Sequence, residues 1–371
     1  MFGRVKVAIM GTGKIAGVMA ETLKSVRGAT FYAVGSRTQD SADKFAQAHG
    51  VKKAYGSYEE LLADPKVDLV YVATPHSEHY KNVRLALMNG KNVLCEKAFM
   101  LNERQAEDIF NLADEKKLLV VEAMWTRFHP MRKKLDEILA SNVIGETTML
   151  TANLGYNIRE KDRIKLPELG GGALLDLGVY TLNFASMVFG NEVTDIVSMC
   201  SFNEQGMDLH DSITLRYKNG KMAVLNASAL SVSDRKGVIY GSKGFIVVDN
   251  INNIEGITVY DSTYKKLAYY KRPKQKTGYE YEVEACVKAI ADKRTECPQM
   301  PHEETLKMLN MMDFIRNSNN IKFPGENDLA SEEQPVAEAK ADEQAVAEAP
   351  VATEEPKTEN ETDSVEDQSK E

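Results

Sequence analysis

Two stretches of the sequence carry polar side chains in places that solvation alone does not explain. Lys97 follows the apolar run at 92–96, which we expect to be a strand, and ligands bind beyond the carboxyl ends of strands in parallel sheets. Asp176 and Tyr180 stand in an apolar segment that begins after three glycines at 170–172, and on a helix their spacing of four residues places them on one face. Both stretches are candidates for chemistry, although a surface lysine and a structural Asp–Tyr hydrogen bond explain the same patterns.

The beginning of the chain is typical of a dinucleotide-binding turn. Residues 5–10 are expected to form a buried strand, and a helix is expected at 16–25. Between them, Gly11 permits a tight turn, Gly13 leaves room for a phosphate against the backbone, and Ala16 allows close packing of helix and strand. A glycine-rich turn alone is a weak signal, but this strand and helix favour a pyrophosphate site over a structural turn. Its expected contacts are Gly11, Thr12, Gly13, Lys14 and Ile15.

The residues that follow the second expected strand, at 30–35, favour NADP(H) over NAD(H). An NAD-selective site usually has Asp or Glu at this point, where the carboxylate binds the ribose 2′-hydroxyl. This chain has Ser36, Arg37 and Thr38 instead. A guanidinium and two hydroxyls bind a 2′-phosphate that a carboxylate would repel. We therefore expect Arg37 to be the main determinant, although an isolated arginine is more often a solvated loop residue.

Composition limits the classes of protein that need to be considered. The four cysteines are scattered with no C-x-x-C spacing, which favours a reducing, cytoplasmic compartment and no structural zinc. No stretch approaches the roughly 20 apolar residues of a membrane span, and the strand at 5–10 begins too early for a removable signal peptide. Residues 326–371 carry 16 acidic and 3 basic side chains, so the preceding residues have a net charge of about +4 and no basic cluster typical of nucleic-acid binding.

The order of the expected elements divides the chain into three parts. Strands and helices alternate over residues 1–122, which predicts an α/β Rossmann domain with a doubly wound parallel sheet. Longer strands with turn signals follow, so residues 123–324 are expected to form an α+β domain with a mostly antiparallel sheet. Asn219-Gly220 between two such strands indicates a hairpin. Residues 325–371 are rich in Glu, Ala, Pro, Thr and Ser and predict an acidic, disordered tail.

Taken together, these motifs resemble the glucose–fructose oxidoreductase/inositol dehydrogenase/rhizopine-catabolism (Gfo/Idh/MocA) family. The resemblance covers roughly residues 4–324 and rests on the segments 11–16, 73–79, 96–97 and 170–180. The family's Glu-Lys-Pro is Glu-Lys-Ala here. Residues 122–128 and the tyrosine at 180 are most similar to members that oxidise diols or D-xylose with NADP.

The resemblance implies an oxidoreductase that acts on a sugar or sugar-like diol. Tyr180 would be the acid/base for the substrate hydroxyl, Lys97 would favour the tyrosinate and polarise the substrate oxygen, and Asp176 would orient the pair. The cofactor would also contact Thr74, Pro75, His79, Glu96 and Lys97. His76 and Trp125 are expected substrate contacts, although purely structural roles also explain them. Relatives imply a homodimer or larger homo-oligomer formed by the open face of the second sheet.

Two other functions fit the same motifs. A non-catalytic NADPH-binding sensor would need only the glycine turn and Arg37, so the presence of Lys97, Asp176 and Tyr180 argues against it. A family member that holds NADP tightly and passes hydride between two sugars would keep every one of these residues. We expect no metal, nucleic acid or membrane among the partners.

Overall fold

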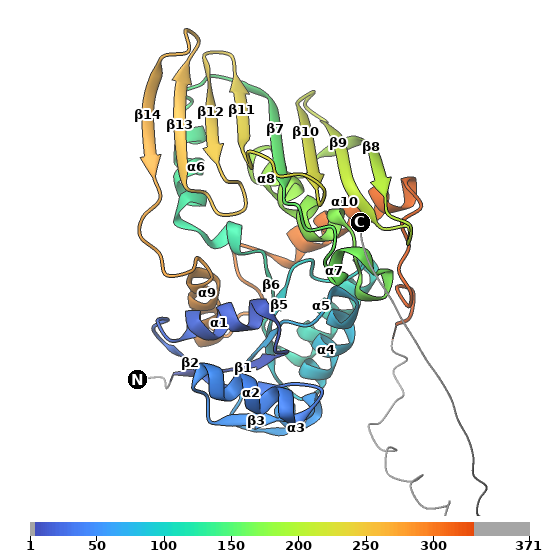
Figure 1. Cartoon of the computed structure of the whole chain (residues 1–371). Coiled ribbons are helices and arrows are strands. Elements are labelled where there is room, and N and C mark those ends of the chain that lie inside the picture. The colour runs from blue at the N-terminus through green and yellow to red at the C-terminus, as the bar shows by residue number, and fades with distance from the viewer. Residues whose placement is uncertain (1–3, 330–371) are drawn as a thin grey trace, which may run out of the picture. The chain divides into compact units, whose positions relative to one another are not determined.

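The computed structural model describes residues 4–329, so the expected acidic tail lies outside the described residues except for 325–329. Two sheets carry the fold, and Figure 1 shows them with their helices. The strands of the first sheet end at Ala123, and those of the second lie between Thr147 and Lys271. This arrangement confirms the predicted class, a Rossmann-like parallel sheet followed by an α+β part with a mostly antiparallel sheet.

The first sheet is parallel and has the strand order β3-β2-β1-β4-β5-β6. The direction of strand addition reverses between β1 and β4, and in such sheets ligands bind beyond the carboxyl ends of the strands at this point. The carboxyl ends of β1, β4 and β5 therefore bring the glycine turn, the segment 73–79 and Lys97 to one edge of the sheet. The strands are β1 (Val5–Met10), β2 (Ala29–Gly35), β3 (Lys53–Tyr55), β4 (Leu69–Val72), β5 (Asn92–Glu96) and β6 (Val120–Ala123).

The helices that connect these strands begin in two different ways. The side chains of Thr38, Ser57 and Asn102 cap three of them by accepting a backbone N–H, as polar residues at helix starts commonly do. The first helix has Gly13 at its N-cap and no side-chain cap, so its first N–H groups remain available to a ligand. The helices are α1 (Lys14–Leu23), α2 (Gln39–His49), α3 (Tyr58–Ala63), α4 (His76–Met88) and α5 (Glu103–Lys116).

The second sheet has the order β14-β13-β12-β11-β7-β10-β9-β8 and is antiparallel except for the pair β7 and β10. The predicted hairpin at Asn219-Gly220 is confirmed, because it joins β9 to β10. Alternate residues of β10 are buried, and helix α8 packs against β7 and β10. The strands are β7 (Thr147–Gly155), β8 (Val193–Phe202), β9 (Asp208–Tyr217), β10 (Met222–Ser228), β11 (Gly237–Gly241), β12 (Gly244–Asp249), β13 (Gly256–Asp261) and β14 (Lys266–Lys271).

The helices of the second part depart from expectation at one functional segment. Residues Leu174–Gly178 form a π-helical turn (η3), and the regular helix α8 (Val179–Phe189) begins only after it. The sequence predicted no stretch that approaches a membrane span, but Pro167–Phe189 is long and apolar enough to cross one; 89% of its 18-residue apolar window is buried inside the protein. The remaining helices are η1 (Trp125–Phe128), α6 (Pro130–Ala140), α7 (Asp162–Lys165), η2 (Pro167–Leu169), α9 (Glu280–Ala291) and α10 (His302–Ser318).

Candidate active site

The glycine turn between β1 and α1 has two glycines with different physical roles. Gly11 has φ +108°, and a Cβ there would lie 2.8 Å from the carbonyl oxygen of Ala73, so the fold itself requires a glycine. A Cβ on Gly13 would meet nothing within 4 Å. That open space lies at the uncapped N-terminus of α1, where backbone N–H groups and the helix dipole favour an anion. The turn therefore fits the pyrophosphate of a dinucleotide.

The residues after β2 present a cation beside this turn. Ser36 is buried, and its hydroxyl lies 3.4 Å from that of Thr12 in the glycine turn. Arg37 is exposed, and its side chain has no hydrogen bond or ion pair among residues 4–329. Its charge is felt by Tyr58, where it opposes the rise in pKa that burial causes. Arg37 is thus a free guanidinium at the end of β2, as binding of a 2′-phosphate would require.

Lys97 and Asp176, which are distant in the sequence, form an ion pair. The Lys97 ammonium donates to the backbone oxygen of Asp176 at 2.9 Å and to its Oδ1 at 3.1 Å. The loop after β5 supplies the lysine, whose peptide bond to Ala98 is cis, and the turn η3 supplies the aspartate. Asp176 is buried and the Lys97 side chain is only 11% exposed, so the pair is little screened by water.

Tyr180 lies beside this pair in the first turn of α8. The Lys97 Nζ is 5.1 Å from the centre of the Tyr180 ring, and the indole N–H of Trp125 donates to the Tyr180 hydroxyl at 3.1 Å. Tyr279 stacks on Trp125 with ring centres 4.2 Å apart and an interplanar angle of 8°. The structure therefore places Lys97, Asp176, Tyr180 and Trp125 in one cluster. Tyr279 extends this cluster through its stacking on Trp125.

The protonation states of this cluster follow from burial and charge. Burial raises the pKa of Tyr180 well above its usual value, and Tyr279, Glu96 and Asp176 act in the same direction. Burial would also raise the pKa of Asp176, but the charges of Lys97 and Arg163 outweigh it and the pKa is lowered. The expected tyrosinate is therefore not the state that this arrangement favours. Tyr180 is a neutral phenol and Asp176 a carboxylate.

The two histidines of the segment 73–79 contact backbone oxygens rather than other side chains. His76 Nδ1 lies 2.8 Å from the Gly170 oxygen and its Nε2 3.2 Å from the Lys97 oxygen, so the ring lies between the glycine triplet and the lysine loop and, when neutral, donates to one of these oxygens. Burial lowers the pKa of His76 to about 4, so the imidazole is neutral near pH 7. His79 contacts the oxygens of Thr74 and Ala98, each at 2.9 Å. Thr74 and Pro75 lead directly into α4.

Glu96 is buried one residue before Lys97. Its carboxylate accepts a hydrogen bond from the Tyr71 hydroxyl, and burial raises its pKa. Arg127 of η1, by contrast, binds Asn183 at 2.7 Å and Glu304 at 2.8 Å. That guanidinium therefore links η1 to α8 and α10.

One polar contact of this cluster was missed in the sequence. The Arg163 guanidinium of α7 lies 3.1 Å from Asp176 Oδ2, the carboxylate oxygen that Lys97 does not contact. No motif predicted this contact, because α7 is a single short turn between irregular segments. The only available signal was the basic character of residues 161–165 just before the glycine triplet.

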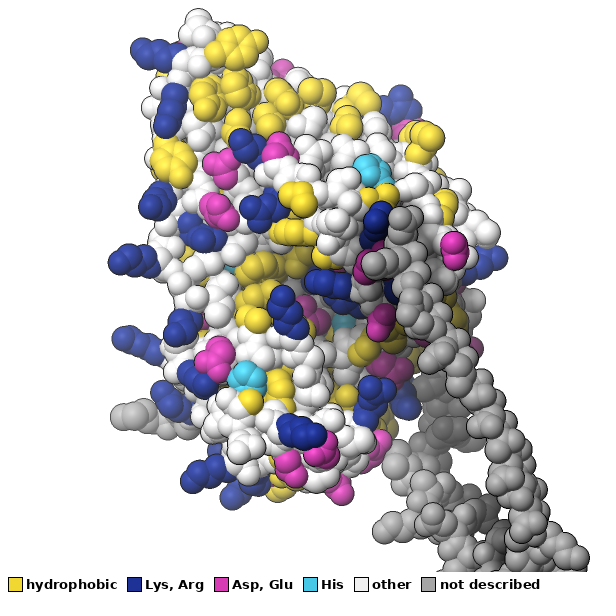
Figure 2. Space-filling model, in the orientation of Figure 1, with side chains coloured by type: hydrophobic (Ala, Val, Ile, Leu, Met, Phe, Trp, Pro, Cys, Tyr) yellow, Lys and Arg dark blue, Asp and Glu magenta, His cyan; other side chains and the backbone are white. Residues whose placement is uncertain are grey.

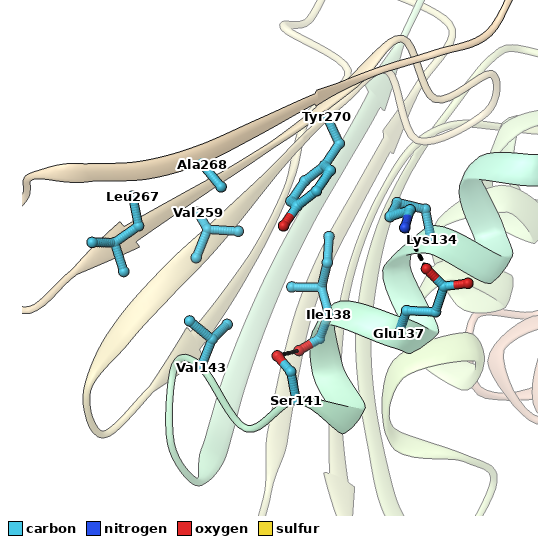
Figure 3. Close-up of a pocket in the computed structure, with 9 residues that line it drawn as sticks. All are labelled: Lys134, Glu137, Ile138, Ser141, Val143, Val259, Leu267, Ala268 and Tyr270. Carbon is cyan, nitrogen blue, oxygen red and sulfur yellow. Dashed lines mark hydrogen bonds and ion pairs between the residues drawn. The ribbon is translucent and has the colours of Figure 1, made fainter.

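The cavity in Figure 3 lies away from these residues. It has a volume of about 160 Å³ and lies between α6 and the neighbouring strands β13 and β14. Its walls are mainly apolar, and its charged groups, Lys134 and Glu137, are paired with each other. Nothing in it matches the chemistry that the cluster around Lys97 offers.

A parallel sheet with an open glycine turn and a buried Lys–Asp–Tyr cluster at the same edge defines a dinucleotide-dependent oxidoreductase. Residues 5–124 match the model described as the oxidoreductase family, NAD-binding Rossmann fold, and residues 133–247 match the GFO/IDH/MocA C-terminal domain. The chain therefore belongs to the Gfo/Idh/MocA oxidoreductase family, and the resemblance drawn from its motifs is confirmed.

Similar proteins include dehydrogenases of diols and sugars. Trans-1,2-dihydrobenzene-1,2-diol dehydrogenase of Xenopus tropicalis is 32% identical over 302 residues, which are 79% of this chain and 90% of the relative. D-xylose 1-dehydrogenase (NADP(+)) of Hypocrea jecorina is 30% identical over 86% of this chain and 93% of its own length. Among solved structures, the 3-ketoreductase KijD10 of Actinomadura kijaniata, in complex with NADP, matches with a TM-score of 0.78 at 23% identity. The match covers 85% of this chain and 98% of KijD10, and it shows the shared fold.

Proposed function

We propose that this protein is an NADP-dependent oxidoreductase that transfers hydride between nicotinamide and the alcohol or hemiacetal carbon of a sugar or sugar-like diol. The observation that carries the proposal is the buried cluster of Lys97, Asp176 and Tyr180 at the sheet edge that also holds the open glycine turn. The relatives named for diol and D-xylose oxidation support the substrate class.

In this proposal Tyr180 moves the proton. Burial keeps the phenol protonated, so Tyr180 is ready to donate to a carbonyl oxygen in the reducing direction. In the oxidising direction it must first lose that proton, and Lys97 is the nearby cation that favours the loss. Asp176 holds Lys97 in position. Bound nicotinamide would supply or accept the hydride.

The cofactor contacts proposed from the sequence fit the observed surface. Gly11, Thr12, Gly13, Lys14 and Ile15 would hold the pyrophosphate at the start of α1. Ser36 and Arg37 would bind the 2′-phosphate and so select NADP, in agreement with the relative named for NADP(+). The edge of the nicotinamide site would be formed by Thr74, Pro75, His79, Glu96 and Lys97.

The substrate would lie against aromatic side chains. Trp125 is buried, stacks on Tyr279 and donates to the Tyr180 hydroxyl, so a sugar ring bound at that hydroxyl would lie next to aromatic side chains. His76 is proposed as a second contact, although both of its ring nitrogens face backbone oxygens in this structure. We further propose residues 1–122 as the cofactor domain, residues 123–324 as the substrate domain, and a cytoplasmic location.

We also propose that the second sheet forms a homo-oligomer. A row of β-branched side chains crosses it in register and points away from α8. Its members are Val197, Thr214, Val224, Thr151, Val238, Val247 and Thr258. Figure 2 shows hydrophobic side chains exposed over the β11–β14 end of the molecule. Within this row Val197 is exposed, Thr258 is buried and the other five are partly buried. An apolar patch exposed on a sheet face is typical of a protein interface.

The test is a panel of aldoses and trans-diols, assayed at the absorbance band of reduced nicotinamide with NADP and with NAD. We expect turnover of at least one substrate, and a higher kcat/KM for NADP than for NAD. NADPH binding with no turnover across the panel would indicate the sensor instead. Nicotinamide that remains bound through purification would indicate hydride transfer between two sugars.

A further inference from the structure

Asp176 is shared by two cations that reach it from opposite ends of its carboxylate. Lys97 Nζ is 3.1 Å from Oδ1, and the Arg163 guanidinium is 3.1 Å from Oδ2. The Asp176 side chain is buried and that of Lys97 is 11% exposed, whereas the Arg163 side chain is 46% exposed. Arg163 therefore approaches the site from the solvent side and lies outside the cluster proposed to do the chemistry.

The backbone fixes the place of Arg163. The N–H of Gly172 donates to the Ile164 oxygen at 3.0 Å, so the residue next to Arg163 is hydrogen-bonded to the glycine triplet. A Cβ on Gly171 would lie 2.7 Å from the same Ile164 oxygen and 2.8 Å from that of Leu166. This close approach is possible only with glycine. The short helix α7 and the turn that carries Asp176 thus form one packed unit.

We propose that Arg163 is a positioning residue of this site, which holds the outer oxygen of Asp176 and offsets part of its charge so that the Lys97 ammonium is left less neutralised beside Tyr180. This role rests on the proposed function, because it matters only if Tyr180 exchanges a proton. The reasoning is electrostatic. Asp176 raises the pKa of Tyr180, so a cation that offsets Asp176 makes the phenol easier to ionise.

No other group around Asp176 and Tyr180 replaces the effect of Arg163 on the charge of Asp176. Tyr180 faces Lys97, Asp176, Glu96 and Tyr279, and of these only Lys97 is a cation. Asp176 faces Lys97, Arg163 and His76, and His76 is neutral near pH 7 because burial lowers its pKa to about 4. Loss of the Arg163 charge therefore has no substitute among these neighbours.

The experiment compares Arg163→Gln and Arg163→Lys with Arg159→Gln. Arg159 is a suitable control, because it is exposed, precedes the same turn and pairs only with Glu160 at 3.4 Å among the described ion pairs. In the oxidising direction the rate rises as Tyr180 loses its proton. We expect Arg163→Gln to move that rise upward by about one pH unit, and to lower kcat about tenfold at a pH below it. KM for NADP should not change.

Arg163→Lys should recover most of the wild-type pH profile, and Arg159→Gln should match it throughout. A wild-type profile for Arg163→Gln would overturn the proposal. A shifted profile that Arg163→Lys does not recover would also overturn it, because a lost charge would then not be the cause.

A second measurement needs neither cofactor nor substrate, so it separates this inference from the proposed function. Trp125 is the single tryptophan of the chain, and it donates to the Tyr180 hydroxyl, so ionisation of that phenol should quench its fluorescence. We expect the quenching midpoint to lie higher in pH for Arg163→Gln than for the wild type, and the transition to disappear in Tyr180→Phe. Equal midpoints would refute the role of Arg163 even in an active enzyme. A shifted midpoint in a protein that turns over no substrate would leave it standing while the proposed function fails.

Discussion

At the scale of residues, the site depends on how charges are distributed around one phenol. Burial and the neighbouring Glu96 and Asp176 raise the pKa of Tyr180, and the hydrogen bond from Trp125 lowers it. The Lys97 ammonium, 5.1 Å from the centre of the ring, is the cation that we propose acts against the rise. Asp176 holds the Lys97 ammonium in place, but it also partly neutralises the positive charge, since the carboxylate lies 3.1 Å from the ammonium. In the proposed mechanism, proton transfer at Tyr180 therefore depends on the balance between the charges of Lys97 and Asp176.

Tyr180→Phe tests the acid/base role. We expect kcat to fall by about 10²–10⁴-fold, the usual contribution of a positioned acid or base. The dissociation constant for NADPH, measured by fluorescence titration, should stay within about twofold, because the hydroxyl binds Trp125 rather than the glycine turn. Tyr217→Phe is the control, since this buried tyrosine packs on Phe189. Normal turnover by Tyr180→Phe would remove the residue from the mechanism.

Arg37→Ala tests cofactor selection. Loss of a charge-assisted contact with the 2′-phosphate should weaken NADPH binding by about 10–100-fold, and NADH binding should hardly change. Isothermal titration with both nucleotides measures the difference. Arg27→Ala removes an exposed arginine at the opposite end of β2 and should alter neither affinity. Equal losses for the two nucleotides would contradict the role of Arg37.

At the scale of elements, the sequence predicted those helices, strands and turns whose signal lies within a short stretch of residues, as a hydrophobic period or a turn motif. The alternating strands and helices of the first sheet and the Asn219-Gly220 hairpin were identified in this way. The π-helical turn was missed, because a spacing of four residues has the same appearance in either kind of helix. Helix α6 was not predicted, and neither was the Arg163 contact, which depends on the packing of α7 against the glycine triplet.

Gly171→Ala tests that packing. The added Cβ would press on the oxygens of Ile164 and Leu166, so we expect a loss of about 1–3 kcal/mol in the free energy of unfolding, as overpacking usually costs. Gly17→Ala is the matched control, because its Cβ would meet only the His49 ring at ordinary contact distance, 3.4 Å. Urea denaturation compares the two. If Gly171→Ala had the same free energy of unfolding as the wild type, α7 would have shifted to accommodate the added Cβ and the packing argument would be wrong.

At the scale of the whole molecule, the second sheet exposes apolar side chains, and we propose that they form an interface between copies of the chain. Val197 and Met199 of β8 are 67% and 76% exposed. We expect Val197→Asp to lower the mass measured by light scattering, because a buried charge would oppose association. Val232→Asp introduces the same charge at a residue that is 80% exposed and lies outside the strands, and it should leave the mass unchanged. A monomeric wild type would contradict the proposed oligomer.

Gly13 separates what the fold needs from what a ligand needs. Its backbone is in the extended region that any residue adopts, and a side chain there would meet no protein atom. A serine at this N-cap would stabilise α1 by roughly a few tenths of a kcal/mol through a hydrogen bond to the free N–H groups. Gly13→Ser should therefore raise the melting temperature and weaken the affinity for NADPH. A polar N-cap residue at position 13 would make the fold more stable. We therefore interpret Gly13 as a residue that lowers thermal stability slightly and leaves space for the coenzyme.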